Sequence, residues 1–192
     1  DNFNIFMNPY TKKCYDDKKF AFLSDYVRLV VIEANGGIYF DTDVEVVKSF
    51  DDLLDCKAFF GFETNEYVNT GVGFGAEAHN PAIIQMLKEY EPLLDGRQGI
   101  IGCPHLNTKA LIKCGLKKNG QKQDLKDASV FPAEYFNPYD APTGKLNKSE
   151  LTYSIHWYAA SWMDKKQRLR SKISKPIHRL LGKDFFRKKQ KN

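Results

Sequence analysis

A long apolar helix pattern that stops at two glycines and leads straight into two aspartates constrains the fold of this chain more than any other feature. Apolar residues keep a helical spacing within residues 11–35, so we predict a helix there, in one or two pieces. The glycine pair at 36–37 ends it, because glycine readily adopts the left-handed conformation that closes a helix. The apolar residues 38–40 then predict a short strand, and Asp41 and Asp43 follow directly.

Strand and helix patterns alternate along the rest of the chain. Amphipathic helices are predicted over 81–94 and 107–116, and further strands over residues 58–63, 67–76 and 128–136. Residues 152–162 are predicted to form a final aromatic strand or turn. Such alternation predicts a layered α/β domain. In open α/β sheets, ligands bind beyond the carboxyl ends of the strands, and this is where the two aspartates lie.

The charge of the chain is uneven along its length. Its 192 residues suit one domain with a substantial core. Residues 165–192 carry 12 Lys and Arg and one acidic residue, whereas residues 1–164 are net negative, which argues against a uniformly basic nucleic-acid binder. We therefore expect a domain over 1–164 and a basic amphipathic tail over 165–192. The apolar residues that recur in the tail predict a peripheral contact with an anionic membrane.

Cysteine usage and hydropathy bear on the compartment. No apolar run approaches the ~20 residues of a transmembrane helix. The cysteines form no C-x-x-C pair, so buried thiols are expected rather than zinc ligands or disulfides; they are Cys14, Cys56, Cys103 and Cys114. Free thiols favour a reducing compartment. We therefore expect a cytoplasmic protein, placed peripherally on the inner face of the membrane.

Asp41 and Asp43 flank Thr42, and residues i and i+2 of a strand point the same way. Two carboxylates so placed can share a hard divalent cation such as Mg²⁺ or Mn²⁺, which prefers oxygen ligands and often bridges to phosphates. Alternatively, one binds metal and the other a sugar hydroxyl. A solvated strand end is the remaining reading of a lone D-x-D motif.

Four other positions have both a structural and a functional reading. Asp25 and Arg28 lie one helical turn apart and form either an ordinary ion pair or a fork for vicinal sugar hydroxyls. Asn69 is either a turn residue or a hydrogen-bonding group beside a ligand. His156 is either a core histidine or a nitrogen ligand that joins the aspartate oxygens. The Trp162 indole can only donate, which suits a phosphate oxygen.

Taken in order, these motifs resemble the signature of the DXD sugar-binding glycosyltransferases. The motifs are S-D-x-x-R, G-G-x-Y-x-D-x-D, N-x-G-V and H…S-W, and they extend from Lys18 to Trp162. The group includes initiating mannosyltransferases and bacterial capsule and lipopolysaccharide enzymes. The resemblance implies a GT-A-type, Rossmann-like domain with a mostly parallel mixed sheet flanked by helices.

The resemblance also implies roles for individual residues. Asp43 would coordinate the metal, while Asp41 would contact the ribose or sugar or reach the metal through water, and both count as catalytic. His156 corresponds to a metal or diphosphate contact of the relatives. The other matching positions would bind the nucleotide sugar: Asp25 and Arg28 its hydroxyls, Tyr39 the pocket wall, Asn69 the sugar, and Ser161 and Trp162 the diphosphate.

The expected function is therefore metal-dependent, retaining transfer of a hexose in bacterial surface-polysaccharide synthesis. The donor would be a UDP- or GDP-hexose, and the acceptor a saccharide or a lipid-linked sugar. Relatives begin with a further strand that supplies much of the nucleotide-base pocket, so we expect this chain to be N-terminally truncated. Two alternatives remain open: a non-catalytic nucleotide-sugar-binding remnant, and a D-x-D phosphatase that forms an acyl-phosphate on aspartate.

Overall fold

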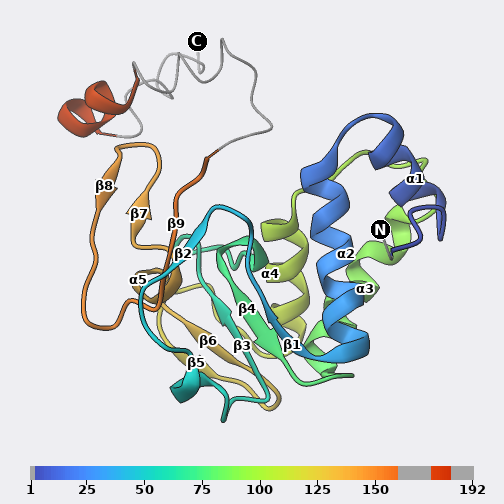
Figure 1. Cartoon of the computed structure of the whole chain (residues 1–192), viewed down its shortest axis with the longest axis horizontal. Helices are drawn as coiled ribbons and strands as arrows, with labels where there is room; N and C mark the ends of the chain where they lie inside the picture. Colours follow the sequence, from blue (N-terminus) through green and yellow to red (C-terminus); the bar gives the residue numbers. More distant parts are fainter. Residues whose placement is uncertain (1–2, 160–173, 183–192) are drawn as a thin grey trace.

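A computed structural model of the chain describes residues 3–159 and 174–182 (Figure 1). The helices are α1 (Pro9–Asp16), α2 (Phe20–Asn35), α3 (Pro81–Tyr90), α4 (Cys103–Lys113) and α5 (Ala133–Phe136), with short 3-10 turns at Asp51–Leu53, Thr70–Val72 and Glu91–Leu93. The strands are β1 (Gly37–Tyr39), β2 (Val44–Val46), β3 (Ala58–Gly61), β4 (Phe74–Ala76), β5 (Gln123–Asp124), β6 (Ser129–Phe131), β7 (Tyr139–Asp140), β8 (Lys145–Leu146) and β9 (Ser154–His156).

The main sheet of the described chain has five strands in the order β1-β4-β3-β6-β5. It is a mixed sheet with helices packed on it, which confirms the α/β class. The expectation that its pairings are mostly parallel is wrong. Only β3 and β6 pair in parallel, whereas β1–β4, β3–β4 and β5–β6 are antiparallel. The two other described sheets, β2–β9 and β7–β8, are antiparallel pairs.

The apolar residues of the central strands divide between two cores because successive strand residues point to opposite faces. Phe60 and Phe74 belong to the larger core, under helices α1–α4. Phe59 belongs to the smaller core on the other face, together with Phe136 of α5 and Tyr153 beside β9. Figure 1 shows α1, α2 and α3 to the right of the sheet, with α5, β9 and the β7–β8 hairpin to its left. The domain therefore has three layers.

The helix predicted before the aspartates is present in two pieces. Asn8 caps α1 through a hydrogen bond from Thr11 N to its side chain (2.9 Å), and Lys18 interrupts the helix with a φ of 56°. Helix α2 ends at Gly36, whose φ is 67°. A Cβ at Gly36 would lie 2.8 Å from the Ala78 backbone nitrogen, so the turn into β1 requires glycine.

Several short elements differ from the sequence predictions. The 67–76 run is not one strand, because the turn at Thr70–Val72 interrupts it before β4. Within 128–136, the strand ends at Phe131, and Pro132 is the N-cap residue of α5. Strand β2 was not expected, nor were β5, β7 and β8, which lie in segments with polar loop composition.

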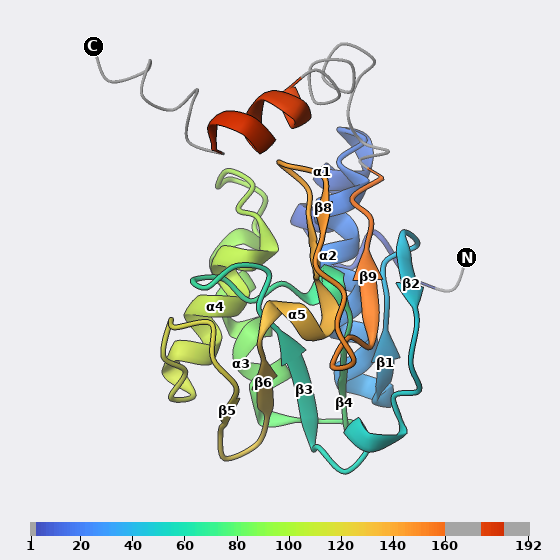
Figure 2. The same ribbon diagram turned by 90° about the vertical axis from the view of Figure 1, so that its left-hand side faces the viewer.

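The described part of the basic tail, residues 174–182, contains a helix over 174–181, which packs on the β7–β8 hairpin (Figure 2). Lys175 Nζ donates to Tyr139 Oη (2.9 Å), and Arg179 donates to the carbonyl oxygens of Thr143 (3.3 Å) and Gly144 (3.2 Å). These two cations are therefore engaged with the domain. Among the residues placed by the structure, no helix has both the length and the apolarity to cross a bilayer.

Helices α3 and α4 are joined by a buried carboxylate whose removal we expect to destabilise the fold. Glu89 of α3 is 5% exposed and accepts from Lys113 and from Lys109 (2.9 Å), both on α4. Burial alone would raise the pKa of Glu89, but the two ammonium groups lower it below its usual value. Because the lysines are largely exposed, Glu89→Gln should cost only about 1–2 kcal/mol of unfolding free energy at pH 7.

The same pair of helices predicts a pH dependence. A lowered folded-state pKa stabilises the fold above the unfolded pKa of about 4.3, and this contribution is lost as the pH falls through the folded value. The difference between wild type and Glu89→Gln in urea unfolding should therefore shrink in acid. The matched control is Glu91→Gln, at an exposed position two residues further along the chain, and it should leave the unfolding free energy unchanged. A difference that persists unchanged in acid would contradict the role of the Glu89 charge.

Candidate functional site

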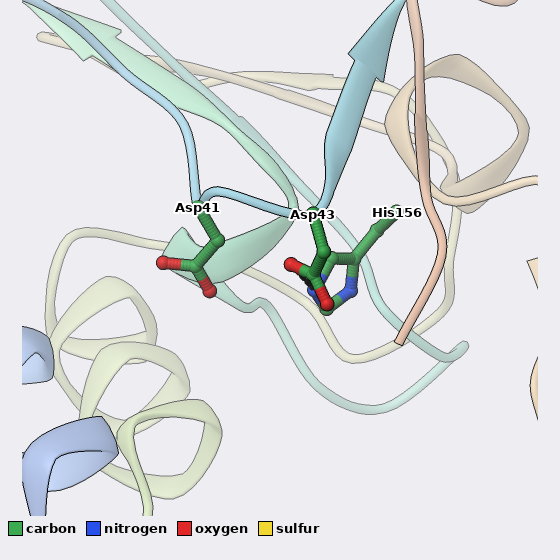
Figure 3. Close-up of side chains that lie close together, drawn as sticks. All are labelled: Asp41, Asp43 and His156. Atoms are coloured by element: carbon green, nitrogen blue, oxygen red, sulfur yellow. Dashed lines mark ion pairs between the residues drawn. The ribbon is translucent and has the colours of Figure 1, made fainter. Parts of the chain in front are cut away.

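The loop between β1 and β2 places two aspartates beside a histidine from the far end of the domain. Strand β1 ends at Tyr39 and is followed by Phe40 and then Asp41, whereas Asp43 directly precedes β2. Strand β2 pairs with β9 in a register that sets Val44 opposite His156. The histidine therefore lies against Asp43, although more than 100 residues separate them in the sequence. Figure 3 shows the Asp43 carboxylate in front of the imidazole ring, with Asp41 beside it.

Asp41, Asp43 and His156 form a candidate metal centre. One potential ligand atom from each lies within 4.8 Å of the others. The His156 Nε2 atom is 3.1 Å from Asp43 Oδ1, and the backbone nitrogen of Ala159 donates to Asp43 Oδ2 (2.7 Å). His156 is buried, and its Nδ1 atom has no hydrogen-bond partner among the described residues. Two carboxylates and an imidazole are a donor set that fits Mn²⁺ or Mg²⁺.

Tyr39 and Arg28 hold the carboxylate of Asp41 from the side of α2. The Tyr39 hydroxyl donates to Asp41 Oδ1 (2.8 Å), and Arg28 Nη1 lies 3.4 Å from the same oxygen. The guanidinium carbon is also 4.8 Å from the centre of the Tyr39 ring, a cation–π contact. Burial raises the pKa of Tyr39 above its usual value, so the phenol keeps its proton and acts as a hydrogen-bond donor.

The predicted fork on α2 is a buried ion pair. Arg28 Nη2 donates to Asp25 Oδ1, and the Arg28 side chain is 2% exposed. Burial lowers the pKa of Arg28, but the carboxylates of Asp25 and Asp41 raise it by more, so the guanidinium stays charged. Burial raises the pKa of Asp25, and Arg28 opposes that shift. The Arg28 guanidinium is thus one cation shared between the carboxylates of Asp25 and Asp41.

Gly71 marks the point where three of the predicted residues meet. A Cβ there would lie 2.6 Å from Asp41 Oδ2, 3.1 Å from Asn69 Oδ1 and 3.2 Å from Arg28 Nη1. Asn69 caps the turn that contains Gly71, and its side-chain oxygen accepts from Gly71 N (2.7 Å). Glycine is therefore needed here for the close approach of the turn to Asp41, not for its backbone angles.

Most of the predicted site residues come together, and the structure adds others. Asp25, Arg28, Tyr39, Asp41 and Asn69 are linked by the contacts above, and Asp43 and His156 adjoin them. Ser161 and Trp162 lie outside the described residues.

Gly71, Cys103 and Tyr158 were not singled out from the sequence as site residues. Cys103 contacts Asn69, and the Tyr158 ring lies 4.0 Å from the His156 ring, centre to centre. The glycine inside N-x-G-V was the one sequence signal for this group, since it breaks a strand pattern without an evident turn.

Comparison with known proteins bears on the region that contains α2 and the aspartates. Residues 2–60 match the family described as the glycosyltransferase sugar-binding region containing DXD motif. A stretch of 48 residues is 44% identical to Glucan organizing enzyme 1 of Cryptococcus neoformans var. grubii serotype A. It covers 25% of this chain and 13% of that protein. This relative is fungal, so the expected bacterial setting finds no support in it.

The matched residues include most of the site. Asp25, Arg28, Tyr39, Asp41 and Asp43 all fall within 2–60, whereas Asn69 and His156 reach the site from outside the match. The mixed α/β domain is consistent with the GT-A-like fold of such enzymes. Residues 2–60 are therefore similar to the glycosyltransferase sugar-binding region that contains the DXD motif.

Proposed function

We propose that the chain forms the nucleotide-sugar site of a metal-dependent retaining glycosyltransferase that transfers a hexose. One observation carries the proposal: Asp41, Asp43 and His156 lie within 4.8 Å of one another, directly beside the Arg28–Tyr39–Asn69 cluster. A divalent-cation site next to fixed hydrogen-bonding groups is what binding of a sugar diphosphate requires. A cation site without the neighbouring hydrogen-bonding side chains would be an ordinary metal site.

Asp43, Asp41 and His156 would hold the cation, with Asp43 as the central ligand. His156 contacts Asp43 directly, and Asp41 is oriented by Tyr39 and Arg28. When bound, Mn²⁺ or Mg²⁺ supplies Lewis-acid stabilisation of the negative charge that builds on the departing diphosphate. The protein contributes by keeping the carboxylates in place before substrate arrives, because the hydrogen bonds from Tyr39 and from Ala159 N fix one oxygen of each.

Charge balance supports the need for a cation. A diphosphate would meet two carboxylates at the end of β1, and one like-charge contact at ~4 Å costs roughly 4 kcal/mol at an effective dielectric of ~20. Arg28 offsets part of this repulsion, but it is already shared between Asp25 and Asp41. A cation held by Asp41, Asp43 and His156 would offset the remaining repulsion.

The Asp25–Arg28 pair, Tyr39 and Asn69 would contact the transferred sugar. They contact Asp41 from α2, from β1 and from the turn at Thr70–Val72. The diphosphate roles of Ser161 and Trp162 stay predictions. Retention of configuration is expected from the family resemblance, and front-face attack by the acceptor hydroxyl is the mechanism proposed here.

The acceptor is proposed to be a saccharide or a lipid-linked sugar. The name of the fungal relative refers to glucan, a glucose polymer, so a glucose donor is a leading candidate beside other UDP- and GDP-hexoses. The membrane contact of the basic tail also stays a prediction. Lys175 and Arg179 are engaged with the hairpin, so it would depend on the other basic residues of 165–192 and on the exposed Leu180.

The test is a thermal-shift screen of UDP- and GDP-hexoses with Mn²⁺, Mg²⁺ or EDTA. A ligand present at 100 times its Kd stabilises the native state by about 2.7 kcal/mol. We expect at least one nucleotide sugar to raise the melting temperature with metal and none to do so in EDTA. Release of nucleoside diphosphate in the presence of acceptor then separates an active transferase from a binding remnant. Failure of every donor to stabilise the metal-loaded chain would refute the proposal.

A further inference from the structure

A buried polar face of α4 holds the turn that reaches the site. Thr108 Oγ1 accepts from Val68 N (2.9 Å), and Asn107 Nδ2 donates to Thr70 Oγ1 (3.0 Å). Cys103, one turn earlier on the same face, donates from Sγ to Asn69 Oδ1 (3.3 Å). Cys103 and Asn107 are four residues apart and lie one above the other on α4, and Thr108 adjoins Asn107. Burying polar groups is costly unless they are paired. Three side chains of α4 therefore hydrogen-bond to the consecutive residues Val68, Asn69 and Thr70.

The hydrogen bonds to Asn69 fix which way its amide points. The backbone N–H of Gly71 can only donate, so the Asn69 atom that lies 2.7 Å from it must be the oxygen. That oxygen also accepts from Cys103, and a carbonyl oxygen has two lone pairs. Both acceptor positions are thus occupied inside the protein. The –NH₂ group of Asn69 has no acceptor within the part of the chain that the structure describes.

The Cys103 thiol is suited to act as a permanent hydrogen-bond donor. It is 5% exposed, at the first residue of α4. Burial raises the pKa of the thiol well above its usual value, and the nearby Asp25 carboxylate raises it further, so the proton stays on sulfur. Burial raises the pKa of Asp25, and a hydrogen bond from the Cys103 thiol opposes that rise, so the one thiol proton is shared between Asn69 Oδ1 and the Asp25 carboxylate. One side chain thereby connects Asn69 with the Asp25–Arg28 pair.

Resting on the proposed function, we infer that Cys103 is a positioning residue that makes Asn69 a hydrogen-bond donor toward the transferred sugar. Arg28 is also a pure donor, and its Nη1 atom, which lies 3.4 Å from Asp41 Oδ1 in an ion pair, makes no hydrogen bond among the described residues. Two neighbouring groups that can only donate select a sugar that presents an oxygen lone pair to them, such as a hydroxyl. The corresponding deoxy sugar lacks that acceptor and is discriminated against, because the donors are left unpaired.

The first test compares binding of a nucleotide sugar and of the matching nucleoside diphosphate, with Mn²⁺, by calorimetry. Cys103→Ala should weaken nucleotide-sugar binding about fivefold, the value of one neutral hydrogen bond, and leave nucleoside diphosphate binding unchanged. Cys103→Ser should recover part of the loss, because its hydroxyl donates although it reaches less far. Cys14→Ala, which removes a buried thiol of α1, is the matched control and should change neither affinity.

The second test needs no ligand. The side-chain amide of Asn69 should be rigid by ¹⁵N relaxation in wild type and in Cys103→Ser, and mobile in Cys103→Ala. Unchanged rigidity in Cys103→Ala, or an equal loss of both affinities, would overturn the positioning role. Increased mobility without any nucleotide-sugar binding in wild type would leave the positioning role standing and refute the proposed function instead.

Discussion

Asp43→Asn is expected to abolish metal-dependent binding of nucleotide sugar while the fold stays intact. The substitution removes the charge of the carboxylate that contacts both His156 and the Ala159 backbone, but it keeps the size of the side chain. Residues that only hold a metal ligand in place are worth about 10- to 100-fold in affinity, so loss of a ligand's charge should cost at least 100-fold. Calorimetric titration of Mn²⁺ in the presence of a nucleoside diphosphate measures the change directly.

The control for Asp43→Asn is Asp55→Asn, which removes one negative charge from an exposed position. Asp55 precedes β3, whose first residue, Ala58, lies opposite Ala76 at the end of the sheet remote from Asp41. It should bind metal and nucleotide like wild type. If Asp43→Asn and wild type give the same metal-dependent heat, the aspartates are a solvated strand end and the proposed mechanism is wrong.

Gly71→Ala should damage the site almost as severely, although it adds a single methyl group. That methyl would lie 2.6 Å from Asp41 Oδ2, and Asp41 is the neighbour that can give way because its side chain is partly exposed. Displacing a catalytic group by about 1 Å can cost on the order of 100-fold in rate. We therefore expect a loss of that order in turnover, with a change of only about 1 kcal/mol in unfolding free energy.

Two measurements separate these effects for Gly71→Ala. Urea unfolding reports the fold, and release of nucleoside diphosphate reports turnover. Gly99→Ala, at a glycine with open space around its Cβ position, is the control and should leave both unchanged. A Gly71→Ala protein that turns over like wild type would show that the 68–71 turn does not border the bound substrate.

The first part of the fold was predictable because its signals are local. The apolar spacing in α2, the glycine at its end and the short run of β1 are each readable within a few residues. Strand β2 is different, since the segment Val44–Val46 is too short to predict and has a glutamate at its centre. The strand exists because β9 pairs with it. The number of parallel strand pairs was overestimated because alternation of helices and strands in the sequence does not reveal strand direction. Strand β4 lies between β1 and β3 and runs antiparallel to both.

The candidate site was predictable as a list of residues, but not as a network. The two aspartates and the α2 pair stand out by spacing, and the order of motifs added Asn69 and His156. Spacing could not show that Arg28 is shared between Asp25 and Asp41, because the second contact depends on how β1 lies against α2. Nor could it show Cys103, whose thiol matters only because the turn carrying Asn69 packs on α4.

The pairing of β2 with β9 has a consequence for the timing of synthesis. The two-stranded ribbon sets His156 against Asp43 and joins segments more than 100 residues apart. A two-stranded ribbon is marginal by itself, and chains emerge from the ribosome N-terminus first. The nascent protein can therefore fold α2 and expose both aspartates well before their third partner has been translated. The proposed metal site would then be completed late in synthesis, and a chain released before β9 would lack the His156 ligand.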